Sequence, residues 1–245
     1  MEGGCEQKNT IVFLIIAAFE VEGIKGATMD KKTLVAVEAL KHISEGNVVG
    51  LGSGTTASQF IMELGKSNLR DKIVGVATSI ASENLAREAG LKTVDIDDVD
   101  WIDVTVDGAD EVDNDLNILK GGGGQLTREK IVWKKSRKYI VIITDDKLVT
   151  RIPEKRGIPV EIIHFGKFTT MKKLESLGLN CKLREGFITD NGNVICDCFP
   201  SEMENLEALE GRIKAVSGVV ESGLFLGGKK TILVADNDRI RVIGS

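Results

Sequence analysis

Histidine is scarce in this 245-residue chain, which has only His42 and His164. Zinc sites, Ser-His-Asp triads and imidazole acid–base pairs all depend on histidine, so the sequence disfavours these three chemistries. Proton transfer therefore falls to carboxylates and lysines.

Cysteine and long apolar runs are also scarce. The four cysteines form no C-x-x-C pair, and a chain this long needs no disulfide to stabilise its core, so the sequence predicts no disulfide and a reducing compartment. The apolar run 11–19 is shorter than the roughly 20 residues that span a bilayer, and its flanks are unlike those of a signal peptide. The sequence favours a non-native start, with translation beginning at Met29, and leaves 1–28 as an N-terminal extension.

The chain has no excess of basic charge. Lys and Arg number 32 against 37 Asp and Glu, for a formal net charge of -5. A nucleic-acid-binding protein usually carries a net basic face, so no nucleic acid is expected as a partner, and without a spanning run no membrane is either. The length suits one compact domain, or a large domain that carries a smaller one.

Strand and helix patterns alternate regularly from Asp30 onward. Short apolar runs at strand spacing alternate with apolar residues at helical spacing. The predicted strands are 47–51, 72–78, 92–96, 103–107 and 139–144, and the predicted helices are 30–43, 55–64, 82–89 and 127–135. This alternation predicts a Rossmann-like, doubly wound parallel sheet with helices on both faces.

The order changes after Pro159. The predicted elements are strand 160–163, helix 168–177, strands 181–185 and 193–198, helix 202–216 and strand 219–225. The order β-α-β-β-α-β is that of a ferredoxin-like module. A final hairpin, 231–235 and 239–243, most simply returns to the first sheet. We therefore expect an α/β fold with a Rossmann-like catalytic domain (29–157 plus 225–245) and an inserted, smaller ferredoxin-like α+β domain (158–224).

A glycine loop, Gly52-Ser-Gly54-Thr-Thr-Ala57, lies where a predicted strand becomes a helix. Backbone N–H groups and the positive end of the helix dipole attract an anion there, although such a loop can also be simply a tight turn. A dinucleotide or a methyl donor needs an acid at the end of the next strand, and that strand ends Ala77-Thr-Ser79. A phosphate without an adenosine ribose fits the loop better.

Acids, a lysine and four glycines follow the strand 103–107. Asp107 ends this strand and Asp110 follows it, at the carboxyl end where ligand sites lie in open α/β sheets, although such acids can also be a solvated run. Lys120 precedes the four glycines at 121–124, whose flexibility indicates that the backbone passes close to another group. Glu129 falls in the first turn of the next helix, where complementing the helix dipole is the alternative role.

Together these groups match the needs of an aldose–ketose isomerase. A carboxylate takes a carbon-bound proton, and an ammonium and backbone N–H groups stabilise the resulting oxyanion, without metal or imidazole. A sugar-phosphate sensor from a related fold is the alternative, but it would normally bring a DNA-binding helix-turn-helix, which the sequence lacks.

Five segments resemble the type A ribose-5-phosphate isomerases: GLGSGTTA, VDGADEV, KGGGGQLTREKI, PVEI and TDNGNVICD. The resemblance runs from about Met29 to the C-terminus. It implies interconversion of D-ribose 5-phosphate and D-ribulose 5-phosphate through an enediolate, in the non-oxidative pentose phosphate pathway. It also implies a metal-independent cytoplasmic enzyme with no cofactor, a sugar phosphate substrate, and a homodimer or homotetramer.

The resemblance also assigns roles to residues. Glu129 matches the general base, Asp107 and Asp110 match acids that bind sugar hydroxyls and assist ring opening, and Lys120 matches the lysine beside them. The expected substrate-binding residues are Ser53, Gly54, Thr55, Thr56, Gly108, Ala109, Gly121, Gly122 and Gly123, with Lys147 and Lys32 on the phosphate side. GSGTT stands where many members read GTGST, an exchange that keeps the hydroxyl donors.

Overall fold

The computed structural model describes residues 29–202, 205–237 and 239–244. The predicted N-terminal extension, 1–28, lies outside the described residues. Within the described ranges no helix is both long enough and apolar enough to cross a membrane.

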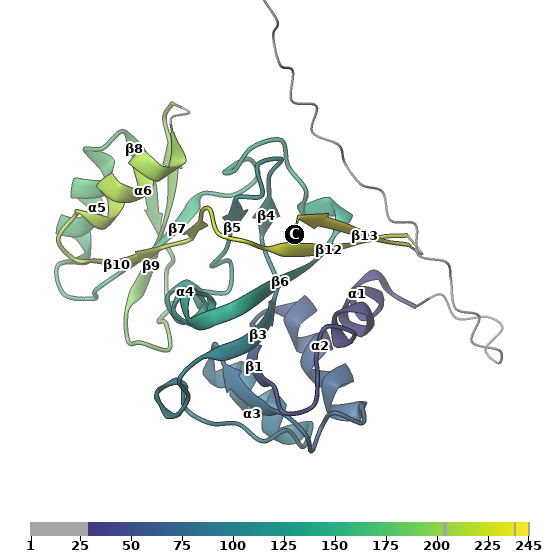
Figure 1. Ribbon diagram of the computed structural model, residues 1–245. Coiled ribbons are helices and arrows are strands. Elements are labelled where there is room, and N and C mark those ends of the chain that lie inside the picture. Colours follow the sequence, from purple (N-terminus) through teal and green to yellow (C-terminus); the bar gives the residue numbers. More distant parts are fainter. Residues whose placement is uncertain (1–28, 203–204, 238, 245) are drawn as a thin grey trace, which may run out of the picture.

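The larger sheet has six strands in the order β13-β12-β6-β3-β1-β2, as Figure 1 shows. Their bounds are β1 (Val48–Leu51), β2 (Val74–Ala77), β3 (Ile102–Asp107), β6 (Ser136–Thr144), β12 (Thr231–Asp236) and β13 (Arg239–Gly244). Every neighbouring pair is parallel except β12 with β13. The C-terminal hairpin thus joins the first sheet, as the sequence predicts.

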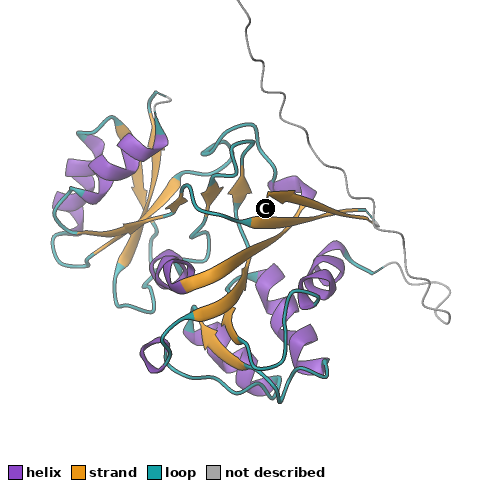
Figure 2. Ribbon diagram, viewed as in Figure 1, coloured by secondary structure: helices purple, strands orange, loops and turns teal. Residues whose placement is uncertain are grey.

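Helices cover both faces of this sheet (Figure 2). They are α1 (Lys31–Leu40), α2 (Thr55–Lys66), α3 (Ile80–Glu88) and α4 (Leu126–Lys135). Alternate residues of β6 point to opposite faces: Ile140 and Ile142 pack in the core that includes α1 and α2, while Tyr139 and Val141 pack in a second core with Trp133 of α4. Burial on both faces explains why the central strands are almost continuously apolar.

A second, antiparallel sheet has the order β10-β7-β9-β8. Its elements are β7 (Ile158–Ile162), α5 (Lys167–Glu175), β8 (Leu179–Leu183), β9 (Val194–Pro200), α6 (Leu206–Lys214) and β10 (Val219–Ser222). The β-α-β-β-α-β order is the ferredoxin-like one, and the α/β class is as predicted. The exact domain limits, 29–157 plus 225–245 and 158–224, stay a prediction.

Two predicted strands are wrong in part. The stretch 92–96 makes only an isolated bridge, between Thr93 and Gly75, and passes into the 3-10 helix η1 (Ile96–Asp98). The Asp95 side chain accepts a hydrogen bond from the Asp97 N–H, which favours the turn over a longer strand.

The predicted strand 219–225 is divided at Gly223 into β10 and β11 (Leu224–Phe225). β11 joins a small sheet with β5 (Ile118–Leu119) and β4 (Glu111–Val112). A Cβ on Gly223 would overlap the Lys120 carbonyl oxygen, so glycine allows this close crossing.

The expected absence of disulfides is also wrong. Cys181 of β8 lies directly opposite Cys198 of β9, and the two form a disulfide. The sequence does not give the register of two strands that pair, so spacing alone could not reveal this pair. Cys196 is free and buried.

Candidate active site

The first glycine loop packs directly on Asp107, at the carboxyl ends of β1 and β3. The Ser53 N–H donates to Asp107 Oδ1 at 3.1 Å, and the Gly108 N–H donates to the same oxygen at 2.8 Å. A Cβ on Gly52 would overlap the Asp107 carboxylate. Glycine at 52 therefore permits this contact, which brings the loop and the acid together.

Three charged side chains form a buried cluster beside this loop. Lys120 Nζ lies 3.1 Å from Asp107 Oδ2 and 3.2 Å from Glu129 Oε1. Asp107 is 0%, Lys120 3% and Glu129 5% exposed. Tyr139 donates its hydroxyl to Asp107 Oδ2 at 3.1 Å. The cluster joins residues of β3, α4 and β6 to the lysine that precedes the second glycine loop.

The two carboxylate oxygens of Glu129 differ in their partners among the described residues. Ser53 Oγ donates to Glu129 Oε1 at 2.9 Å, the oxygen that also faces Lys120. Glu129 Oε2 is buried and has no hydrogen-bond partner among the described residues. A buried polar atom without a partner is costly and rare, so Oε2 is open to a further partner such as a substrate.

Burial and neighbouring charges set the protonation states of the cluster. Burial raises the pKa of Glu129 to about 7, against the opposing effect of the Lys120 charge. Burial lowers the pKa of Lys120, but Asp107 and Glu129 outweigh it and the net pKa is raised, so the ammonium persists. Burial, followed by the Asp107 charge, raises the pKa of Tyr139 well above its usual value, so the phenol keeps its proton. Near neutral pH, Glu129 is therefore the member of the cluster best placed to exchange a proton.

The second glycine loop lies against Asp110. The Gly122 N–H donates to Asp110 Oδ2 at 2.6 Å, and a Cβ on Gly122 would overlap that carboxylate. Gly121 has a φ of 101°, which favours glycine. The Gly123 N–H has no partner among the described residues, and a Cβ on Gly123 would enter open space. The loop therefore presents a free backbone donor next to an empty region.

The predicted phosphate-side residues lie in part around the start of α2. Lys32 Nζ donates to Thr55 Oγ1 at 2.9 Å. Gly54 has a φ of 86°, and no side chain caps the helix that it precedes. The N–H groups of this first turn are therefore open to an anion.

The other expected binding residues are more dispersed. Lys147 pairs with Asp146 at 3.6 Å, and among the described residues no hydrogen bond or ion pair joins it to the first loop. Lys120 Nζ donates to the Gly108 carbonyl, and Ala109 packs beside the second core. Thr56 lies half-buried in α2. The binding roles of all these residues remain predictions.

Tyr139 and Thr78 belong to the site, although no motif in the sequence singles them out. Tyr139 is the single tyrosine of the chain and lies on a buried strand, and a polar group in such a place needs a buried partner. Thr78 Oγ1 lies 3.0 Å from Ser53 Oγ. Its place just past β2, at the ligand-binding edge of the sheet, was the available indication.

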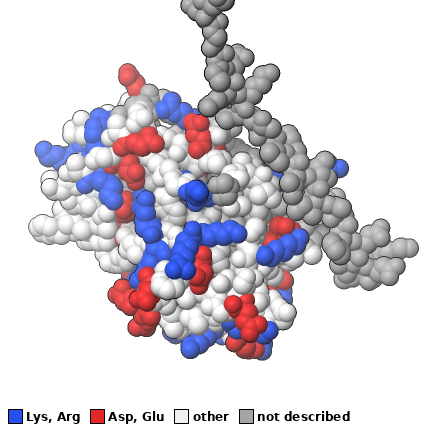
Figure 3. Space-filling model, in the orientation of Figure 1, with Lys and Arg blue, Asp and Glu red and all other residues white. Residues whose placement is uncertain are grey.

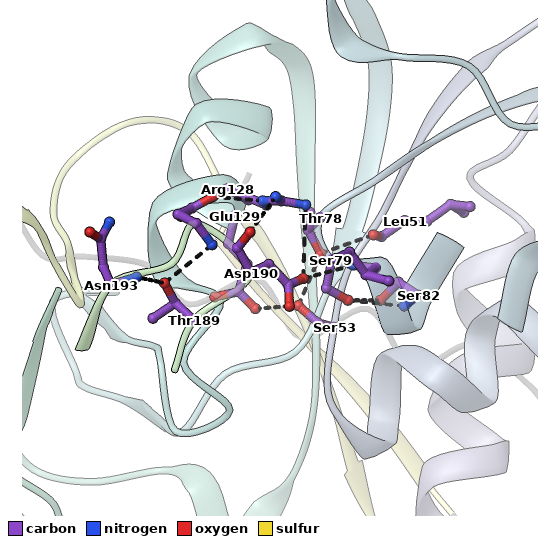
Figure 4. A network of polar contacts seen from close by, with 12 residues as sticks. Leu51, Ser53, Thr78, Ser79, Ser82, Arg128, Glu129, Thr189, Asp190 and Asn193 are labelled. Atoms are coloured by element: carbon purple, nitrogen blue, oxygen red, sulfur yellow. Dashed lines mark hydrogen bonds and ion pairs between the residues drawn. The ribbon is translucent and has the colours of Figure 1, made fainter. Parts of the chain in front are cut away.

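A turn of the second sheet also reaches the site, as Figure 4 shows. Asp190 Oδ2 accepts from the Ile80 N–H at 2.8 Å, at the start of α3. Arg128, next to Glu129, donates through Nη2 to the Asp190 carbonyl at 3.0 Å. The sequence indicated a turn here but not that it crosses to the other sheet.

Metal coordination has no evident donor set here. The described residues contain no group of three or more His, Cys, Asp or Glu side chains placed to hold a metal ion. Lys120 supplies the positive charge inside the buried cluster.

Comparison with known proteins identifies close relatives over most of the chain. A family model for ribose 5-phosphate isomerase A (phosphoriboisomerase A) matches residues 74–239. The ribose-5-phosphate isomerase A of Korarchaeum cryptofilum is 41% identical over 219 residues, which cover 87% of this chain and 96% of that protein.

Solved structures agree. Ribose 5-phosphate isomerase A from Methanocaldococcus jannaschii superimposes with a TM-score of 0.83 at 35% identity, covering 88% of this chain and 98% of that one. A D-ribose-5-phosphate isomerase solved in complex with phospho-erythronic acid gives a TM-score of 0.84, also at 35% identity, with the same 88% and 98% coverage.

Proposed function

Because the chain belongs to the ribose 5-phosphate isomerase A family, we propose that it interconverts D-ribose 5-phosphate and D-ribulose 5-phosphate in the non-oxidative pentose phosphate pathway. One observation carries the proposal: a buried carboxylate, Glu129, lies beside a buried ammonium and has one oxygen with no partner in the described part of the chain. A base that must accept a proton from carbon needs such a free oxygen.

The reaction proceeds through an enediolate. Glu129 takes the proton from C2 of the open-chain aldose, the C2–H electron pair forms the C1–C2 double bond, and the former carbonyl oxygen O1 becomes an oxyanion. O1 takes up a proton as O2 gives one up, and Glu129 returns its own proton to C1, which leaves the ketone at C2. Asp107 and Asp110 bind the sugar hydroxyls and assist ring opening.

Stabilisation of the oxyanion needs no metal in this scheme. The Lys120 ammonium is held charged by two carboxylates, and the second glycine loop supplies the free Gly123 N–H. Preorganised donors in a buried site stabilise developing negative charge strongly, because they do not have to reorient during the reaction.

The phosphate binds at the first loop. The uncapped start of α2, the hydroxyls of Thr55 and Thr56, and the Lys32 ammonium that contacts Thr55 all favour a dianion. Lys147 is the further cation that we assign to the phosphate side, where it requires a rearrangement of its pair with Asp146.

The direct test is to mix the purified protein with ribose 5-phosphate in excess EDTA and follow ketose formation. We expect turnover that EDTA does not reduce. Absence of turnover would overturn the proposed reaction, whereas turnover that EDTA abolishes and a divalent metal restores would overturn metal independence alone.

The assembly and the location are further proposals. We propose a homodimer or homotetramer, which the mass in solution tests. We also propose a cytoplasmic location, on the basis of the metabolic relatives and not of cysteine usage, since the Cys181–Cys198 disulfide removes that argument.

A further inference from the structure

Arg184 connects the ferredoxin-like sheet to the second glycine loop. It follows β8, and its Nη1 donates to the Gly121 carbonyl at 2.9 Å and to the Gly122 carbonyl at 3.0 Å. The other side of the guanidinium binds Asp197 of β9, through Nε at 2.7 Å and Nη2 at 2.6 Å. A planar fork held by a bidentate carboxylate has a fixed orientation, so the direction of both carbonyls is fixed as well.

The orientation of a carbonyl decides where the next N–H points. In a planar trans peptide the C=O and the N–H point in opposite directions. When Arg184 holds the Gly121 carbonyl, the Gly122 N–H points away from the guanidinium, and it donates to Asp110 Oδ2 at 2.6 Å. When Arg184 holds the Gly122 carbonyl, the Gly123 N–H points away in the same manner, and it is the donor that lacks a partner among the described residues.

Glycine loops need such an external constraint. Glycine has more accessible backbone conformations than any other residue, and this loop has four in succession. The Gly121 carbonyl also accepts from the Gly124 N–H at 2.9 Å, whereas Arg184 is the one partner of the Gly122 carbonyl among the described residues. Without Arg184, the peptide between Gly122 and Gly123 could therefore rotate, which would misdirect the Gly123 N–H. A hydrogen bond from a guanidinium to the carbonyl also polarises the peptide and strengthens the N–H as a donor.

We propose that Arg184 is a positioning residue for the isomerase reaction: it orients the two peptides between Gly121 and Gly123, so that one N–H holds Asp110 and the other meets the oxyanion of the enediolate. This inference rests on the proposed function. Arg184 itself does not touch the substrate, and it acts from the second sheet through the loop.

A purely structural role makes a different prediction. If Arg184 only held the two sheets together, its loss would lower the melting temperature and would affect substrate and intermediate binding alike. A positioning role mainly affects the stabilisation of the negatively charged intermediate, so kcat falls. KM for ribose 5-phosphate changes little, because the aldehyde group of the substrate is neutral.

The experiment compares Arg184→Ala and Arg184→Lys with the wild type and with Lys182→Ala, which changes an exposed residue of β8 two positions earlier. We measure kcat, KM and the inhibition constant of phospho-erythronic acid, the ligand solved with a relative of this chain, because its carboxylate is negatively charged like the enediolate oxyanion. We expect kcat of Arg184→Ala to fall about 10- to 100-fold, a loss smaller than the 10²- to 10³-fold that follows removal of an oxyanion donor itself. Inhibitor binding weakens with kcat, whereas KM stays within about threefold of wild type.

Several outcomes would contradict the inference. One is an Arg184→Ala variant with kcat within twofold of Lys182→Ala, and another is a loss confined to KM or to the melting temperature. If Arg184→Ala does not fold, Arg184→Lys decides by the same split between kcat and KM, since a single ammonium does not reproduce the fork. An inactive wild type would instead refute the proposed function.

Discussion

At the scale of single residues, the chemistry of the site depends on burial that the sequence could not show. The motif identified Glu129, and its place in the first turn of α4 was equally suited to a surface acid that complements the helix dipole. The structure shows that α4 packs against strands of both sheets. Glu129 is therefore buried beside Lys120, and its Oε2 has no partner within the described ranges.

The pH dependence of activity follows from this burial. Because the pKa of Glu129 is raised to about 7, the carboxylate form that accepts the substrate proton is lost as the pH falls through that value. We expect kcat/KM to rise between pH 6 and 8 with a midpoint near the pKa of about 7, within roughly one unit, as a profile in EDTA buffers would measure. A flat profile across this range would contradict the assignment.

At the scale of elements, the second glycine loop can lie against Asp110 only if the residue at position 122 has no side chain. A Cβ on Gly122 would overlap the Asp110 carboxylate, so Gly122→Ala must displace either the acid or the loop. We expect kcat to fall at least about tenfold, because misplacing a catalytic group by an ångström costs up to 10²-fold. Steady-state kinetics and a melting curve measure the effect.

Gly211→Ala is the matched control for this prediction. Gly211 lies within α6 and a Cβ there would meet no atom within 4 Å. Alanine at this position should leave activity unchanged and stabilise the helix by about 0.5–1 kcal/mol. Equal kinetics for the two alanine variants would contradict the role given to the loop.

Local pattern predicted most elements, and failed where distant segments decide. The alternation of β6 is readable in the sequence, but the polar partner of Tyr139 is Asp107, on a neighbouring strand. The break at Gly223 depends on the approach of Lys120, about a hundred residues earlier in the chain. The Cys181–Cys198 pair depends on the register of β8 against β9. Each of these is a tertiary contact, which no local periodicity encodes.

At the scale of the whole molecule, the site is built between two sheets. Asp107 comes from the larger sheet, while Arg184 and the turn at Asp190 come from the ferredoxin-like one. Lys and Arg side chains gather across the middle of the face in Figure 3, with Asp and Glu above and below them. Charges of both signs therefore share that face, and the chain as a whole has only a small negative net charge of -5.

Burial of the base should also be visible in global stability. The folded protein holds the Glu129 proton more strongly than the unfolded chain does, because the pKa rises from 4.5 to about 7. The contribution of Glu129 to the free energy of unfolding therefore falls as the pH rises through this window. The glutamine side chain of Glu129→Gln cannot ionise, so the free energy of unfolding of this variant does not fall for this reason as the pH rises.

We expect the melting temperature of Glu129→Gln, relative to wild type, to be higher at pH 8 than at pH 5. The difference should be several degrees, since about 1 kcal/mol shifts a domain of this size by roughly 2–4 °C. Glu88→Gln, an exposed acid of α3, should show no such change. A difference in melting temperature between wild type and Glu129→Gln that is the same at pH 5 and pH 8 would contradict a raised pKa of Glu129.

Whether Glu129 is the base is tested most directly by the turnover of Glu129→Gln with ribose 5-phosphate. The amide oxygen can still accept from Ser53 and Lys120, so we expect phospho-erythronic acid to bind within about threefold of wild type while kcat falls about 10²- to 10⁴-fold. Turnover equal to that of wild type would contradict the claim and would move the base to Asp107 or Asp110.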